Sequence, residues 1–176
     1  MHTQERATVL ALAMAAVALH LPMIGWGGPY ATAANRTKTF ETDEILPLGA
    51  LAEMHNTFVV SKPDRNYDYP WWHYFVVAGA QAPYVVYLLI SGELKSPTPE
   101  FPFGLQHPAE ALRGLTLVGR LVSVLMGAGV VVAAYYFSRI LWGYPAGVVG
   151  ALLTMLNYLG FYYSGTGNPD IPAFFW

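Results

Sequence analysis

Acidic residues that could do chemistry lie at the ends of apolar stretches of this sequence. Asp43 and Glu44 are adjacent, Asp68 precedes an aromatic run, and Asp170 is the sole acid after Glu110. A carboxylate within hydrogen-bond reach of a hydroxyl can take its proton during a reaction, and charges placed near a bilayer usually have a function. Each acid also has a plainer explanation, as a solvated helix cap or as part of an ordinary turn. Spacing alone leaves catalysis and capping both open.

The elements that position these acids are membrane helices. The 176 residues are 55% hydrophobic and only 11% charged, whereas soluble domains carry about 25% charged residues. No Asp, Glu, Lys or Arg occurs in 7–35, 121–138 or 140–169, and about 20 apolar residues suffice to cross a bilayer. We therefore expect an all-α integral membrane protein with three or four transmembrane helices. A net charge of −2 and the lack of cysteine exclude a nucleic-acid footprint and thiolate chemistry.

One transmembrane domain is expected. Its elements are a helix over about 7–24, a loop over about 29–70 that holds the candidate catalytic acids, a juxtamembrane or spanning helix over about 71–92, and helices over about 115–137 and 146–163. The first helix could instead be a cleaved signal peptide, because Ala-Thr-Ala at 31–33 fits a cleavage site; its length and the later membrane segments favour retention. Because an apolar run begins shortly before Trp176, we expect the sequence to be truncated at its C-terminus.

The first loop is the main polar segment, since 36–68 holds ten of the twenty charged residues. Proline fits the first turn of a helix, so a short helix is predicted from Pro47 to His55, with an apolar face suited to the membrane surface. We expect the loop to be large, non-cytoplasmic and built around such juxtamembrane helices.

The segment 69–92 admits two topologies. It is uncharged and begins with the aromatic run Trp-Trp-His-Tyr-Phe at 71–75, which is typical of a membrane interface. If it crosses the bilayer, Asp170 lies on the opposite side from Asp43; if it is juxtamembrane, both lie on the same side. A shared site favours the juxtamembrane alternative, which also places Arg139 in the cytoplasm, as the positive-inside rule prefers.

The order of short motifs resembles that of integral membrane glycosyltransferases of the protein-mannosyltransferase and aminoarabinose-transferase type, in the GT-C superfamily. After the first helix come Asp-Glu at 43–44 and Tyr-Pro at 69–70. An Arg-Leu helix ending in Arg, a Trp-Gly turn, a small-residue helix, and a Tyr-Ser segment leading to Asp-x-Pro then follow, in the stretch GRLVSVLMGAGVVVAAYYFSRILWGYPAGVVGALLTMLNYLGFYYSGTGNPDIPAFF. The resemblance covers nearly the whole chain but only the amino-terminal portion of such enzymes. The Pro-rich link at 96–108 and Pro47 depart from the family pattern.

This resemblance implies transfer of a sugar from a polyprenyl-phosphate carrier to an acceptor hydroxyl on the non-cytoplasmic face. It makes Asp43 the catalytic base, with Glu44 beside it and Asp170 as the second acid. Substrate binding is assigned to Asp68, Tyr69, Pro70 and His73.

The leaving lipid phosphate needs a positive charge more than a proton. The loop offers Arg36, Lys38, Lys62 and Arg65, and a divalent metal would serve equally, although no metal ligands are assigned. The expected partners are the bilayer and the lipid-linked sugar, in the plasma membrane of a prokaryote, with no nucleic acid. The alternatives are a non-enzymatic membrane protein, such as a transporter segment or assembly subunit, and an inactive fragment of such an enzyme.

Overall fold

A computed structural model describes residues 3–25, 44–60, 71–98 and 100–176. Within these ranges the chain is built from helices, and its single β-bridge joins Leu94 to Leu105. The elements, in chain order, are α1 (Thr3–His20), the 3₁₀ helix η1 (Leu21–Gly25), α2 (Gly49–His55), the π-helical turn η2 (Asn56–Val60), α3 (Trp71–Ile90), α4 (Pro108–Trp142), α5 (Tyr144–Leu156), α6 (Tyr158–Gly165) and α7 (Asp170–Phe175).

Three helical segments are long and apolar enough to cross a membrane: Gln4–Gly25, Trp71–Ile90 and Pro108–Trp142. The pair α5 and α6 would make a fourth if taken as one bent span. The predicted all-α architecture with three or four helices of spanning length is therefore confirmed for the described residues, and most of the predicted first loop lies outside them.

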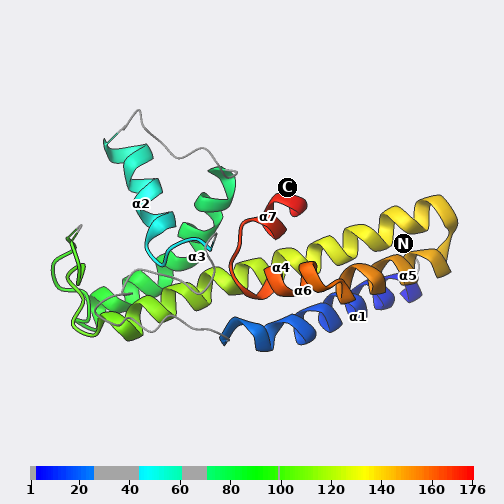
Figure 1. The fold of residues 1–176 in the computed structure, drawn as a ribbon, viewed down its shortest axis with the longest axis horizontal. Coiled ribbons are helices and arrows are strands. Elements are labelled where there is room, and N and C mark those ends of the chain that lie inside the picture. Colours follow the sequence, from blue (N-terminus) through cyan, green and yellow to red (C-terminus); the bar gives the residue numbers. More distant parts are fainter. Residues whose placement is uncertain (1–2, 26–43, 61–70, 99) are drawn as a thin grey trace.

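A bundle of α1, α5 and α6 lies along the carboxyl-terminal part of α4 (Figure 1). Helix α1 is antiparallel to α4, because Glu5 forms an ion pair with Arg139 while the carbonyl of Ile24 accepts a hydrogen bond from Arg120 at 2.8 Å. The α4–α5 contact is close, and a Cβ on Gly147 would lie 2.9 Å from the carbonyl oxygen of Tyr135. Small residues allow such backbone approach in membrane bundles. The core of this bundle consists of Leu12, Ala16, Ala128, Val131, Tyr135, Ala151 and Met155.

The predicted continuous helix over 146–163 is wrong, because the chain bends by 59° between α5 and α6. Asn157 is extended there (ψ 126°), and its side-chain oxygen caps α6 by accepting from the Gly160 N–H at 3.1 Å. On the other side of the break, the Met155 carbonyl lies 3.2 Å from Nε2 of His20. Asparagine competes well for backbone groups, and these polar contacts allow the break.

Other boundaries also differ from prediction. Helix α4 runs over 108–142 rather than 115–137, because Pro108 occupies the first helical position and Gly143 (φ +88°) ends the helix. Helix α2 begins at Gly49 rather than Pro47, after a turn closed by the Gly49 N–H on the Leu46 carbonyl at 2.8 Å. The first helix starts at Thr3 and continues into η1, and α3 ends at Ile90 rather than 92.

Helix α3 packs on α2 and on the first turns of α4, at the end of α4 where the chain enters it (Figure 1). Its polar side chains point inward: His73 and Gln81 are buried, and Gln81 Nε2 donates to the Leu115 carbonyl at 3.0 Å. Its exposed face is apolar and carries Trp72, Phe75, Val86, Tyr87, Leu89 and Ile90. A helix with its polar groups inside and its apolar groups outside is suited to an apolar environment.

Candidate functional site

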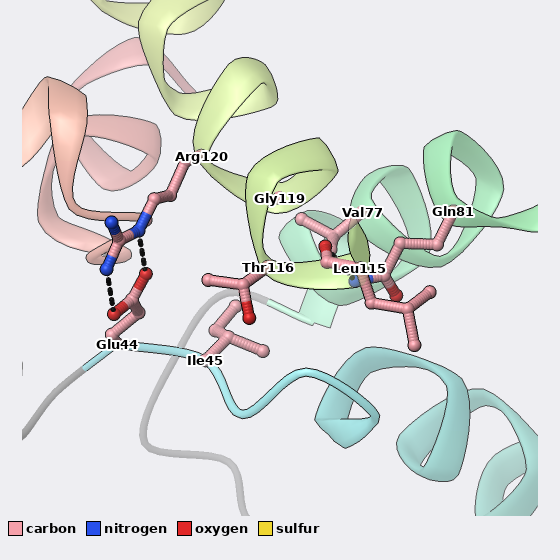
Figure 2. Close-up of a pocket in the computed structure, with 9 residues that line it drawn as sticks. Glu44, Ile45, Val77, Gln81, Leu115, Thr116, Gly119 and Arg120 are labelled. Carbon is pink, nitrogen blue, oxygen red and sulfur yellow. Dashed lines mark hydrogen bonds and ion pairs between the residues drawn. The ribbon is translucent and has the colours of Figure 1, made fainter. Parts of the chain in front are cut away.

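A buried ion pair between Glu44 and Arg120 joins α4 to the segment before α2 (Figure 2). Arg120 Nε donates to one carboxylate oxygen at 2.6 Å and Nη2 donates to the other at 3.0 Å. Arg120 is fully buried and Glu44 is 5% exposed. Such paired contacts use the planar fork of the guanidinium, which lysine could not reproduce.

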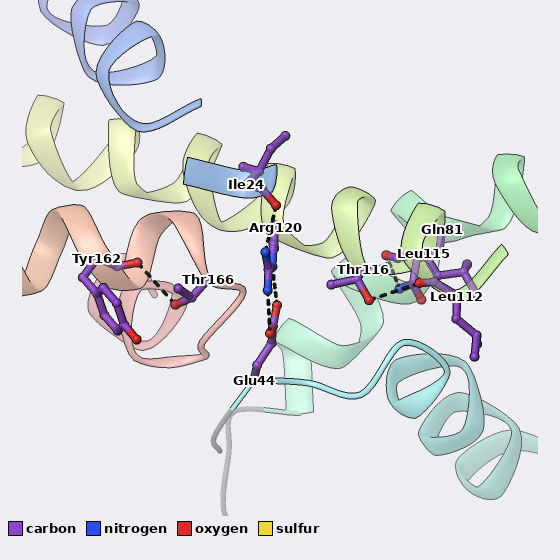
Figure 3. A network of polar contacts seen from close by, with 9 residues as sticks. All are labelled: Ile24, Glu44, Gln81, Leu112, Leu115, Thr116, Arg120, Tyr162 and Thr166. Carbon is purple, nitrogen blue, oxygen red and sulfur yellow. Dashed lines mark hydrogen bonds and ion pairs between the residues drawn. The ribbon is translucent and has the colours of Figure 1, made fainter. Parts of the chain in front are cut away.

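The same guanidinium also holds the end of the first helix. Its Nη1 donates to the carbonyl of Ile24 at 2.8 Å, at the last turn of η1 (Figure 3). Carbonyls at a helix end lack partners within the helix, so Arg120 satisfies one of them. One side chain on α4 thereby contacts both Ile24 and Glu44, which are twenty positions apart in the sequence.

The turn after α6 closes over this pair. Gly167 has a φ of +69°, and a Cβ there would lie 2.9 Å from Glu44 Oε1 and 3.3 Å from Arg120 Cγ. Two residues earlier, a Cβ on Gly165 would lie 2.4 Å from the Cβ of Met23. Only glycine permits both approaches. The whole turn, 164–169, is buried.

A small cavity of about 10 Å³ adjoins the ion pair. It is lined by Glu44, Ile45, Val77, Gln81, Leu115, Thr116, Gly119, Arg120 and Gly167 (Figure 2). Oε1 of Gln81 is buried without a hydrogen-bond partner among the described residues. The cavity is the size of a single water and is too small for a sugar.

The structure describes only some of the residues that were predicted for the site. Asp43, Asp68, Tyr69 and Pro70 lie outside the described residues, as do Arg36, Lys38, Lys62 and Arg65. Glu44 forms the ion pair above. His73 is buried in the first turn of α3, and its Nδ1 lacks a hydrogen-bond partner in the described part of the chain.

Asp170 begins α7, three residues after Gly167, and its N–H donates to Asn168 Oδ1 at 2.8 Å. Its side chain is exposed and lines a separate groove that shares no residue with the Glu44 cavity. The fold therefore brings the turn before Asp170 against Glu44, while the Asp170 carboxylate faces elsewhere.

Sequence reasoning missed Arg120 as a site residue. It considered the cations of the first loop, whereas the partner of Glu44 comes from α4, 76 positions later. A usable signal was present, because Arg120 immediately precedes the uncharged stretch 121–138. An ionisable residue next to a membrane segment marks a functional or pairing role by default.

Among the described residues, no group of three or more His, Asp or Glu side chains is arranged to hold a metal ion. Comparison with known proteins adds no assignment: no family model, curated protein or solved structure matches this chain. The resemblance to membrane glycosyltransferases thus rests on the motif order alone.

Proposed function

We propose that this chain belongs to a membrane glycosyltransferase that moves a sugar from a polyprenyl-phosphate carrier to an acceptor hydroxyl, with Asp43 as general base. The observation that supports it is the buried Glu44–Arg120 pair. Removing the two charges from water costs roughly 10 kcal/mol or less after the structure relaxes. A protein with hydrophobic residues of the same volume in their place is often no less stable. Keeping the pair beside the predicted base is therefore consistent with a role in fixing that base.

In this proposal Glu44 is a positioning residue rather than a second base. Both of its oxygens accept hydrogen bonds from Arg120, which leaves the carboxylate poorly placed to take a proton. Asp43 directly precedes it in the chain. The acceptor oxygen attacks the anomeric carbon, its proton passes to the Asp43 carboxylate, and the bond to the phosphate oxygen breaks. The polyprenyl phosphate leaves with the bonding electrons, and a nearby cation stabilises its charge.

The proposed topology places the Glu44 end of the bundle outside the cytoplasm and makes α3 juxtamembrane. Glu44 and Gly167 lie against each other, and Glu5 lies against Arg139. A crossing by α3 would put the members of each pair on opposite sides of the bilayer. A juxtamembrane α3, with α1, α4 and the α5–α6 pair crossing, is consistent with both contacts.

Single cysteines test this topology without background, because the chain has none. In intact cells, a membrane-impermeant thiol reagent should label cysteines at His55 and Ser96, both exposed, and should label Gln4→Cys only after permeabilisation. Protection of Ser96→Cys together with labelling of His55→Cys would mean that α3 crosses, which contradicts the contacts above.

The catalytic proposal is tested by Asp43→Asn, measured as turnover of a polyprenyl-phosphate-linked sugar in membranes holding equal amounts of protein. Loss of a general base costs about 10²–10⁴-fold, so turnover should fall by that factor. Glu100→Gln, an exposed acid in the link before α4, is the matched control and should keep wild-type turnover. Wild-type turnover in Asp43→Asn would remove the base assignment. If the wild-type protein itself turns over no lipid-linked sugar, the Glu44–Arg120 pair is instead the structural tie of a non-enzymatic membrane protein.

A further inference from the structure

The break between α5 and α6 borders a groove of about 590 Å³ that shares no lining residue with the Glu44 cavity. Helices α4, α5, α6 and α7 form its walls. The lining residues are Val130, Leu153, Thr154, Asn157, Leu159, Gly160, Tyr163, Asp170, Ile171 and Phe174. Of these, Leu153, Leu159 and Phe174 are strongly exposed in the described chain.

The lining of the groove combines apolar walls with a few polar groups. Val130, Leu153 and Phe174 provide apolar surface. Asn157, Tyr163 and Asp170 add polar groups to the same lining. Such a combination is suited to an amphiphilic ligand.

The groove carries one negative charge. Asp170 is the one charged residue among those described that line it, and no ion pair to its carboxylate is found in the described part of the chain. Because the carboxylate is exposed at the edge of an otherwise uncharged lining, it can accept hydrogen bonds from a cationic group that enters the groove.

We propose that this groove binds a membrane lipid whose head group carries a primary ammonium, with the ammonium on Asp170 and an acyl chain along Val130, Leu153 and Phe174. A primary ammonium donates hydrogen bonds to a carboxylate, whereas a quaternary ammonium of the same charge has no N–H to donate. The site does not depend on sugar transfer, because the groove and the Glu44 cavity share no lining residue.

Native mass spectrometry of the detergent-purified protein tests the proposal with phosphatidylethanolamine and phosphatidylcholine of identical acyl chains. These probes share net charge and phosphate and differ in their N–H donors. A hydrogen bond to a charged group corresponds to a factor of about 10 or more in affinity. The wild-type protein should therefore bind phosphatidylethanolamine about tenfold more tightly, and Asp170→Asn should remove most of this preference. Glu110→Gln, an exposed acid outside the groove, should retain it.

A second variant tests the groove without changing charge. A Cβ on Gly160 would make only an ordinary contact, with the Thr154 carbonyl oxygen at 3.5 Å, and Gly160 lines the groove, so Gly160→Leu is designed to reduce its volume. It should weaken binding of both lipids about tenfold. Equal binding of the two lipids by the wild type, a preference that survives in Asp170→Asn, or unchanged binding by Gly160→Leu would each overturn the proposal.

Discussion

Helix α4 carries an arginine near each end of its uncharged stretch, and each arginine binds a glutamate from the amino-terminal part of the chain. Arg120 pairs with Glu44 and Arg139 pairs with Glu5. The two arginines are nineteen residues apart, roughly 28 Å along a helix and close to the thickness of a hydrocarbon core. Their surroundings differ: the Arg120 side chain is fully buried, whereas the Arg139 side chain is 34% exposed.

The difference shows that similar residue pairs perform different tasks at the two ends. The Arg139 pair joins the ends of two neighbouring helices, α1 and α4. The Arg120 pair also holds the Ile24 carbonyl and lies under the glycine turn at 167, so several segments must meet for it to form. The Arg120 pair thus depends on the complete tertiary structure, and we expect it to be the more costly of the two to disrupt.

The largest effect is predicted for breaking the buried pair. Glu44→Gln or Arg120→Met leaves one buried charge without its partner, which typically costs about 3–5 kcal/mol. The free energy of unfolding should fall by that amount when purified protein in mild detergent is titrated with denaturing detergent. The double variant should cost less than the sum of the single variants, because the second substitution removes the unpaired charge. Additive costs would mean that the two residues are not coupled.

A smaller effect is predicted for the turn that closes over the pair. Gly167→Ala meets both a positive φ and a Cβ contact of 2.9 Å to Glu44, so we expect a loss of about 2–3 kcal/mol in unfolding free energy. Gly92→Ala is the matched control, with a φ of +75° and no atom within 4 Å of the added Cβ. It should cost about 1 kcal/mol. If the two variants lose the same unfolding free energy, the Cβ contact with Glu44 has no effect on stability.

Breaking the Glu5–Arg139 pair should lower the free energy of unfolding less than breaking the Glu44–Arg120 pair. Glu5→Gln removes a pair whose arginine reaches solvent, and partly screened pairs contribute about 1 kcal/mol or less. The same detergent titration should therefore show a loss several times smaller than that of Glu44→Gln. A loss as large as that of Glu44→Gln would abolish the distinction between the two ends.

The helices of this fold were largely predictable, whereas the contacts among them were not. Uncharged stretches of about the length of a bilayer crossing identified α1, α4 and the α5–α6 region directly from composition. The break at Asn157 was missed, because asparagine within an apolar run gives no periodic signal, and its cap on Gly160 is visible only in three dimensions. Helix α3 stayed ambiguous, since its composition fits a span while its packing partners are α2 and the first turns of α4.

The site was predictable in part. Motif order selected Glu44, and the structure places it in a buried polar contact. Its partner could not be chosen from sequence, because an ion pair between residues 76 positions apart depends on how α1, α4 and the turn at 167 pack together. Asp170 was expected beside the other acids. The turn before it does reach Glu44, but the start of α7 directs its carboxylate to the lipid-binding groove proposed above.

The smallest loss of unfolding free energy is predicted for a third acid–base pair, Glu93 and His107, which lies in the link before α4. His107 donates its backbone N–H to the Glu93 carboxylate, and its ring Nδ1 lies 2.8 Å from the other oxygen. These hydrogen bonds lower the pKa of Glu93 below its ordinary 4.5 and raise the pKa of His107 above 6.5.

The pair should therefore be strongest between about pH 4.5 and 6.5. The contribution of the Glu93 charge to stability is lost as pH falls through the lowered pKa of Glu93. The contribution of the His107 charge is lost as pH rises through the raised pKa of His107. In Glu93→Gln, NMR titration of the histidine rings should show the pKa of His107 returning toward 6.5, while the free energy of unfolding stays within error of wild type. The His107 ring is 73% exposed, and water solvates its charge about as well as the carboxylate does. A loss of unfolding free energy in Glu93→Gln as large as in Glu5→Gln would mean that burial does not set the order of the three pairs.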